Sequence, residues 1–211
     1  MICAKIKLSF MDNKKGSKMN QPIEIENSGT CQCECVKFNV KGIVLANALC
    51  HCKTCCYNRG MTPVHIHVIS DLESLSSQKP FEGIEITDGK NYLKQFEVED
   101  TKVLHVFCIK CGVMVYQTPK NRLYKTVLPT NFHIEDDEVD DCVRDGKCKL
   151  PEEYRPRMHM NYRYRHYDSN DDLPKFVTWF PNPFYPDEGM CNNKGEEISD
   201  NEIYESFRLA M

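Results

Sequence analysis

The cysteines of this chain occur in short-spaced groups that indicate metal ligation. Thirteen of the 211 residues are cysteine. Two groups, 31–33 and 108–112, have the patterns Cys-x-Cys and Cys-x-x-Cys-Gly, and each such turn can place two sulfurs on one ion. Zn²⁺ binds four thiolates in a tetrahedron, with metal–sulfur distances of about 2.3 Å. We therefore predict a closed, structural zinc site whose binding energy contributes to folding. Its ligands are Cys31, Cys33, Cys108 and Cys111.

A third group places Cys50, Cys52 and Cys55 within one short stretch. Three thiolates can hold a zinc ion and leave a fourth position open, which is typical of a catalytic site. Such an ion could polarise a carbonyl group or take a substrate thiolate. Alternatively, Cys56 completes this site and makes it structural. The remaining cysteines are interpreted as ordinary thiols. They are Cys3, Cys35, Cys142, Cys148 and Cys191.

The cysteine pattern favours zinc over disulfides, redox chemistry or haem. The count is odd, and residues 1–10 are too short and too interrupted by lysines for a secretory signal. A thioredoxin-like motif would need a βαβ context, and covalent haem would need a histidine after the second cysteine. We therefore expect two Zn²⁺ ions per chain, one structural and one catalytic, in a cytoplasmic protein, with the nucleus as a second location.

Composition is that of a globular protein, and it argues against a membrane partner and against a nucleic-acid partner. Hydrophobic residues make up 41% and charged residues 27% of the chain, which is ordinary for a globular domain. No apolar run approaches the roughly 18 residues of a membrane helix. The net charge of -4 argues against broad contact with a phosphate backbone.

The apolar residues alternate with polar ones more often than they recur at helical spacing, which predicts many short strands. Asp88-Gly89 predicts a turn with residues 92–98 as its return strand, and residues 158–164 alternate as a late strand. Helix signals are few: a capping box at 70–73 and a C-terminal segment at 200–209. The predicted fold is mainly β with few short helices. It has a flexible lead-in (1–26), one zinc-binding domain (27–180) and a C-terminal tail (181–211).

The ordered cysteine set resembles the glutathione-dependent formaldehyde-activating enzyme (GFA) family, which includes centromere protein V. The resemblance covers about residues 29–178. Its elements appear in the family's order: Gly-Thr-Cys-Gln-Cys at 29–33, Cys-His-Cys-Lys-Thr-Cys at 50–55, Phe-Cys-Ile-Lys-Cys-Gly at 107–112, and a tail at 156–160 and 172–176.

The resemblance implies a β-tent, in which small antiparallel sheets are clamped by a structural zinc. It implies that Cys31, Cys33, Cys108 and Cys111 hold this zinc, and that Cys50, Cys52 and Cys55 hold the second. The implied activity is that of a carbon–sulfur lyase, which condenses formaldehyde with glutathione to S-hydroxymethylglutathione. The chain departs from the family at Glu34, where members usually have glycine, at Cys35, where a small residue is usual, and at Cys56.

Several side chains are candidates for substrate contact. Lys53, Arg59 or Arg157 could bind the carboxylates of glutathione. His65 and His67 alternate with apolar residues and are interpreted as the polar face of a half-exposed strand, with a role as proton shuttles as the alternative. The leading function is a zinc-dependent carbon–sulfur lyase acting on adducts of glutathione, or a related thiol, with formaldehyde or small aldehydes. The alternatives are a non-catalytic zinc module that binds another protein, and a chromosome- or cytoskeleton-associated protein.

Overall fold

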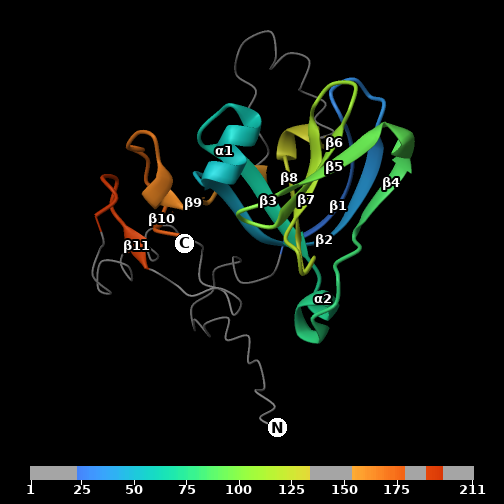
Figure 1. Cartoon of the computed structure of the whole chain (residues 1–211). Helices are drawn as coiled ribbons and strands as arrows, with labels where there is room; N and C mark the ends of the chain where they lie inside the picture. Colours follow the sequence, from blue (N-terminus) through green and yellow to red (C-terminus); the bar gives the residue numbers. More distant parts are fainter. Residues whose placement is uncertain (1–22, 134–153, 179–188, 197–211) are drawn as a thin grey trace, which may run out of the picture.

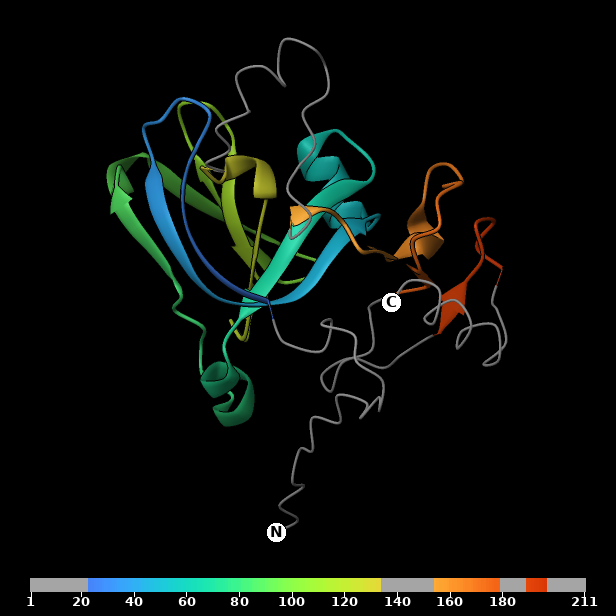
Figure 2. The same cartoon turned by 180° about the vertical axis from the view of Figure 1, so that it is seen from behind.

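The long strand β2 (Lys37–Cys50) is the central strand of the fold and pairs with four other strands. The computed structural model describes residues 23–133, 154–178 and 189–196. The first half of β2 pairs antiparallel with β1 (Ile23–Thr30) and β4 (Ile84–Asp88). The second half pairs antiparallel with β3 (Val64–Ser70) and parallel with β9 (Met158–Met160). A bulge near Val44 separates the halves, and β2 curves through the base of the fold (Figures 1 and 2).

The remaining strands continue the sheet in both directions. The path runs β11-β10-β9-β2-β3-β8-β7-β6-β5, so the described strands form one continuous mixed sheet. Two short helices connect the strands, and in Figure 1 they lie at opposite ends of the fold. The bounds are α1 Lys53–Arg59, α2 Leu72–Ser77, β5 Leu93–Val98, β6 Val103–Cys108, β7 Met114–Thr118, β8 Lys125–Val127, β10 Lys175–Phe176 and β11 Met190–Cys191.

Two apolar clusters stabilise the sheet, and each contains cysteines of one group. The first cluster joins strands β1, β2 and β4 to β6, β7 and β8, and includes Phe38, Cys31 and Cys108. The second lies among β2, β3, β9 and α1, and includes Cys50 and Cys55. A fully buried aromatic or aliphatic side chain contributes about 1.5–3 kcal/mol. The cysteines are therefore fixed by the packed interior and not by loops alone.

The mainly β prediction is confirmed, but several local expectations are not. Strands β4 and β5 flank the predicted Asp88-Gly89 turn, yet they do not pair with each other, because β4 adds to β2 and β5 adds to β6. The late strand ends at Met160, since Asn161 has φ 57° and a 3-10 turn follows. Helix α2 is capped by Asp71, whose carboxylate accepts a hydrogen bond from Ser74 N at 2.6 Å, in place of the predicted capping box.

The ends of the sheet extend beyond the expected domain. Strand β1 begins at Ile23 and β11 lies at Met190–Cys191, so strands occur on both sides of the range 27–180. The predicted C-terminal helix at 200–209 lies outside the described residues. In the described part of the chain, neither helix has the length and apolar character required to cross a membrane.

Strand β3 is buried along most of its length, which corrects the prediction of a half-exposed polar face at His67, whereas His65 is half-buried. Strands β2 and β8 flank it, and His67 is only 1% exposed. The ring of His67 stacks on Tyr154 with centroids 5.8 Å apart. Burial lowers the pKa of His67 to about 4, so the folded protein holds this ring neutral near pH 7.

Replacement of His67 by phenylalanine is expected to flatten the acid side of the stability curve. An unfolded histidine takes up a proton near pH 6.5, whereas the folded His67 does so only near pH 4. Its contribution to stability is therefore present above pH 6.5 and is lost as the pH falls towards 4. Phenylalanine keeps the aromatic contacts and does not titrate. The slope of unfolding free energy between pH 4.5 and 6 should fall by up to about 1.4 kcal/mol per pH unit.

The slope is measured by denaturant titrations at several pH values. A matched control is His166→Gln, because His166 is exposed and lies outside the core. An unchanged slope in His67→Phe would show that His67 is not held neutral by burial.

Candidate functional site: two cysteine clusters

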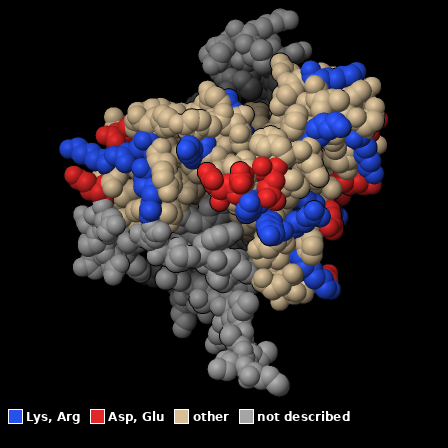
Figure 3. All heavy atoms as spheres, viewed as in Figure 1, with Lys and Arg blue, Asp and Glu red and all other residues tan. Residues whose placement is uncertain are grey.

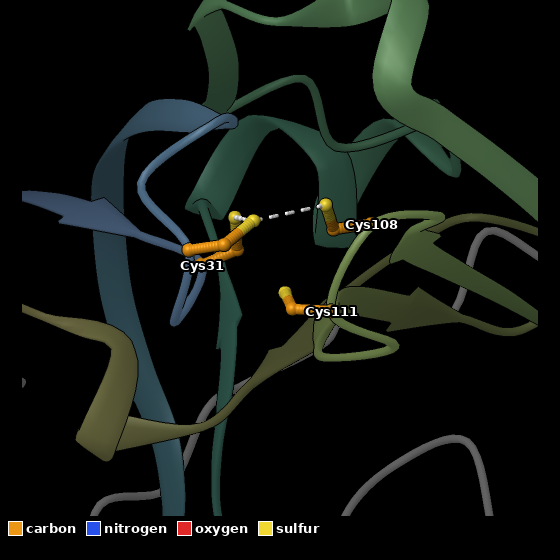
Figure 4. Close-up of side chains that lie close together, drawn as sticks. Cys31, Cys108 and Cys111 are labelled. Carbon is orange, nitrogen blue, oxygen red and sulfur yellow. Dashed lines mark hydrogen bonds between the residues drawn. The ribbon is translucent and has the colours of Figure 1, made fainter.

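The first cluster joins two turns that are far apart in sequence. Cys31 and Cys33 lie in the turn between β1 and β2, Cys108 ends β6, and Cys111 lies in the turn before β7. Their four sulfurs lie within 4.8 Å of one another. The Cys31 and Cys33 sulfurs are 3.5 Å apart, and those of Cys33 and Cys108 are 3.8 Å apart (Figure 4). The structure thus brings all four residues together in a group that could hold a metal ion.

Both turns of this cluster are closed by a backbone hydrogen bond to the carbonyl of their first cysteine. In one, Glu34 N donates to Cys31 O at 2.8 Å, and in the other, Gly112 N donates to Cys108 O at 2.8 Å. The residue after the second cysteine is left-handed in each turn, with φ 58° at Glu34 and 74° at Gly112. This conformation directs backbone N–H groups at the sulfurs: Val36 N donates to Cys31 Sγ at 3.4 Å.

Electrostatics show how a cation would stabilise the ionised form of this group. Burial raises the pKa of Cys31 to about 12. Burial also raises the pKa of Cys111, but the backbone N–H groups of Val113 and Cys33 outweigh it and bring this pKa to about 7. Two thiolates within 4.8 Å repel each other by roughly 3–4 kcal/mol at an effective dielectric of 20. Four thiolates can ionise together only around a positive ion, so the donor set fits a thiophilic metal such as zinc.

The second cluster forms where β2 meets α1. Cys50 is the last residue of β2, Cys52 caps α1, and Cys55 lies in its first turn. Their sulfurs also lie within 4.8 Å of one another. Cys50 and Cys55 are buried and Cys52 is half-buried. Hydrogen bonding among the three thiols raises the pKa of Cys50 and lowers that of Cys55. One sulfur of the group is therefore ready to ionise, and the others need a cation to do so.

Cys56 faces away from this cluster. Its Sγ donates to the Cys50 carbonyl oxygen at 3.6 Å, and burial raises its pKa. It is not among the sulfurs that lie within 4.8 Å of one another. Cys35 likewise belongs to neither cluster, and Cys191 donates to the Lys175 carbonyl at 3.6 Å. Cys3, Cys142 and Cys148 lie outside the described residues.

A network of polar side chains, which runs from buried His51 and His159 to exposed Asp171, holds the cysteine loop of the second cluster. His51 Nε2 lies 2.8 Å from His159 Nδ1, and His159 Nε2 lies 2.9 Å from the Asp171 carboxylate. The Lys175 ammonium donates to the same carboxylate at 2.9 Å. Burial lowers the pKa of both histidines, so both rings are neutral near pH 7. His159 then donates to Asp171 and accepts from His51.

This network of side chains fixes the loop between Cys50 and Cys52. His51 N also donates to Met160 O at 3.0 Å, so the backbone and the side chain of His51 are both attached to β9. His51 therefore points into the protein interior. The Cys50–Cys52 loop gains a rigid attachment to a segment more than 100 residues away.

The basic candidates for substrate contact differ in their availability. Arg59 is occupied: its guanidinium donates to Cys55 O at 3.1 Å and to Gln117 Oε1 at 3.3 Å, and it also contacts Met114. Lys53 is exposed beside Cys52, with its ammonium 5.6 Å from the centre of the Tyr57 ring.

Comparison with known proteins identifies the family. The family model described as "Glutathione-dependent formaldehyde-activating enzyme" matches residues 26–163. The chain belongs to this family. The matched GFA region contains both cysteine clusters, and it ends before β10 and β11.

Two other comparisons add little to the GFA assignment. A solved structure of a protein from Rhodobacter sphaeroides aligns with a TM-score of 0.39 and 18% identity, covering 53% of this chain and 93% of that chain. A similarity at this level does not establish a shared fold or function. A search of the curated proteins gave no significant match.

Several residues around the GFA cysteines had no signal in the sequence. Helix α1 was missed, because its seven residues are too few to show helical periodicity. His159 and Asp171 were not connected to His51, and Gln117 was not connected to Cys55. These contacts join residues 12 to 108 positions apart, so no local spacing rule reveals them.

The departure from the GFA pattern at Glu34 generates a stability prediction. A left-handed conformation costs a non-glycine residue about 1–2 kcal/mol, whereas glycine adopts it freely at an entropic cost of about 0.5–1 kcal/mol. We expect Glu34→Gly to raise the unfolding free energy by about 0.5–1 kcal/mol, because the 58° φ angle is no longer strained.

Chemical denaturation of the metal-loaded protein measures this effect. Glu85, an exposed residue within β4, provides the control: Glu85→Gly should lower stability by about 0.5–1 kcal/mol. If Glu34→Gly is as destabilising as Glu85→Gly, the strain at residue 34 is absent in solution.

Proposed function

We propose that both cysteine clusters bind Zn²⁺, and that the chain is a carbon–sulfur lyase acting on adducts of glutathione, or a related thiol, with formaldehyde or small aldehydes. The observation that carries the proposal is the difference between the clusters. Four sulfurs converge in the first, whereas three converge in the second and Cys56 bonds to a backbone carbonyl. Four thiolates complete a tetrahedral zinc site, and three leave one position for a substrate atom.

Cys31, Cys33, Cys108 and Cys111 would hold the structural zinc, and Cys50, Cys52 and Cys55 the catalytic one. When bound at the second cluster, zinc supplies a Lewis acid that can accept a thiolate sulfur or a carbonyl oxygen. In the synthetic direction, the glutathione sulfur forms a bond to the aldehyde carbon while the thiol proton passes to the carbonyl oxygen. The lyase direction breaks this carbon–sulfur bond and returns the proton to sulfur.

The protein's own groups would position the substrate. Half-buried Cys52 lies at the solvent side of the cluster, with exposed Lys53 next to it. Because Arg59 is bonded to Cys55 and Gln117, Lys53 is the better candidate to bind a glutathione carboxylate by a charge-assisted hydrogen bond. On the face shown in Figure 3, acidic and basic side chains are interspersed, which suits a small charged substrate better than a polyanion.

Substitution of a second-cluster cysteine should remove one metal and the activity together. We expect Cys52→Ser to bind one zinc per chain in place of two, to remain folded through the first cluster, and to lose rate acceleration. Cys56→Ser is the matched control and should retain two zincs and full activity. Native mass spectrometry counts the ions. Exchange NMR with ¹³C-formaldehyde and glutathione at equilibrium separates enzyme-catalysed interconversion from the uncatalysed rate.

Two outcomes would contradict the proposal. Retention of two zincs and full activity by Cys52→Ser would exclude this cluster as the catalytic site. A two-zinc wild-type protein that accelerates no thiol–aldehyde pair would favour the non-catalytic, protein-binding alternative.

A further inference from the structure

Each sulfur of the second cluster receives one N–H hydrogen bond, and each donor comes from a different part of the chain. The Cys52 sulfur accepts from Cys55 N at 3.3 Å, within α1. The Cys55 sulfur accepts from Gln117 Nε2 at 3.3 Å, on β7. The Cys50 sulfur accepts from Asn161 Nδ2 at 3.7 Å, directly after β9. Two of the three donors are therefore side-chain amides from distant segments.

Gln117 is held in a single orientation by Arg59. The guanidinium donates to Gln117 Oε1 at 3.3 Å, which directs the amide nitrogen towards the Cys55 sulfur. The same guanidinium donates to Cys55 O at 3.1 Å, so one cation connects α1 with β7. Gln117 is only 8% exposed, and its amide would lose this hydrogen bonding if it turned away.

Asn161 is held by its backbone. It has φ 57° and ψ 37°, and its carbonyl accepts from Tyr164 N at 3.0 Å. A left-handed residue with a side chain is uncommon outside asparagine, aspartate and histidine. Glycine would meet the backbone requirement equally well but has no amide to reach Cys50.

Charge explains why such donors matter at this cluster. Three thiolates and one Zn²⁺ have a net charge of about -1, which makes the ion electron-rich and a weak acceptor. An N–H···S hydrogen bond withdraws electron density from sulfur, and outer-shell partners of this kind tune metal sites. The guanidinium of Arg59 lies next to the group and offsets its remaining charge.

We propose that Gln117 and Asn161 are positioning residues of the second site, which weaken electron donation by Cys55 and Cys50 so that the bound ion can accept an incoming thiolate. Arg59 acts through Gln117. The inference rests on the proposed occupation of this cluster by zinc and deepens it by naming a thiolate as the fourth ligand. A purely structural role for the amides would leave the metal's spectrum unchanged, which separates the two explanations.

The test uses the full chain with Co²⁺ in place of zinc, because cobalt reports its sulfur ligands by charge-transfer absorption. Gln117→Leu keeps the side-chain bulk but removes the N–H donor. With sulfur lone pairs raised in energy, the charge-transfer band of the second site should move to longer wavelength. Metal affinity at that site near pH 7 should fall by about 10- to 100-fold, because loss of the donor destabilises the Cys55 thiolate relative to the protonated thiol. The first cluster is an internal reference. Because Cys52→Ser should bind metal only at the first cluster, its spectrum gives the contribution of that cluster.

Two further variants keep the test decisive. Gln95→Leu is the matched control, because Gln95 is exposed on β5, and it should change neither the band nor the affinity. Asn161→Gly removes the second amide donor without straining the left-handed backbone. It should shift the band in the same direction, even if Gln117→Leu does not fold.

The outcomes separate this inference from the proposed function. A wild-type chain that binds only one cobalt ion overturns both. Two bound ions, with unchanged band and affinity in every folded variant of Gln117 or Asn161, overturn this inference alone. A shifted band together with weaker binding of glutathione to the cobalt protein, measured by its perturbation of the spectrum, is the expected result.

Discussion

The convergence of cysteine sulfurs, whose thiolates would repel one another without a cation, is the constraint on which this structure depends. Seven cysteine sulfurs lie in two clusters, each within 4.8 Å. Ionising the four thiols of the first group together in this partly buried position requires added positive charge. A divalent ion would supply it, and its binding energy would then be part of the folding energy. Such an ion would hold the turn before β2 and the turn between β6 and β7 together across the apolar core.

Strand β2 joins the two cysteine clusters directly. The turn that carries Cys31 and Cys33 leads into this strand, and Cys50 ends it. The strand pairs with four others, so its end is held firmly even though the second cluster has only three sulfurs. The His51–His159 contact and the two amide donors then attach residues 50–55 to β7, to β9 and to the residue after β9. A metal site with only three protein ligands would thereby remain rigidly positioned.

The sequence was most informative where chemistry is local. Paired cysteines with a following glycine predict a turn with positive φ and two candidate ligands, and Gly112 has this conformation. Alternating apolar residues identified most strands. Strand partners were less predictable: the Asp88-Gly89 turn precedes β5, but long-range packing pairs β4 with β2. The contacts of Gln117 and His159 cannot be predicted from the spacing of residues in the sequence, because they depend on which strands become neighbours. Glu34 was visible as a departure from the family, and the structure explains its cost through φ.

The most direct test of this account is anomalous diffraction at the zinc absorption edge from crystals of the full chain. The account predicts two zinc peaks. One should have four sulfur ligands from Cys31, Cys33, Cys108 and Cys111. The other should have three from Cys50, Cys52 and Cys55 and a fourth ligand from outside the chain. A folded chain with no metal at either cluster, or a second ion closed by a fourth protein ligand, would contradict it.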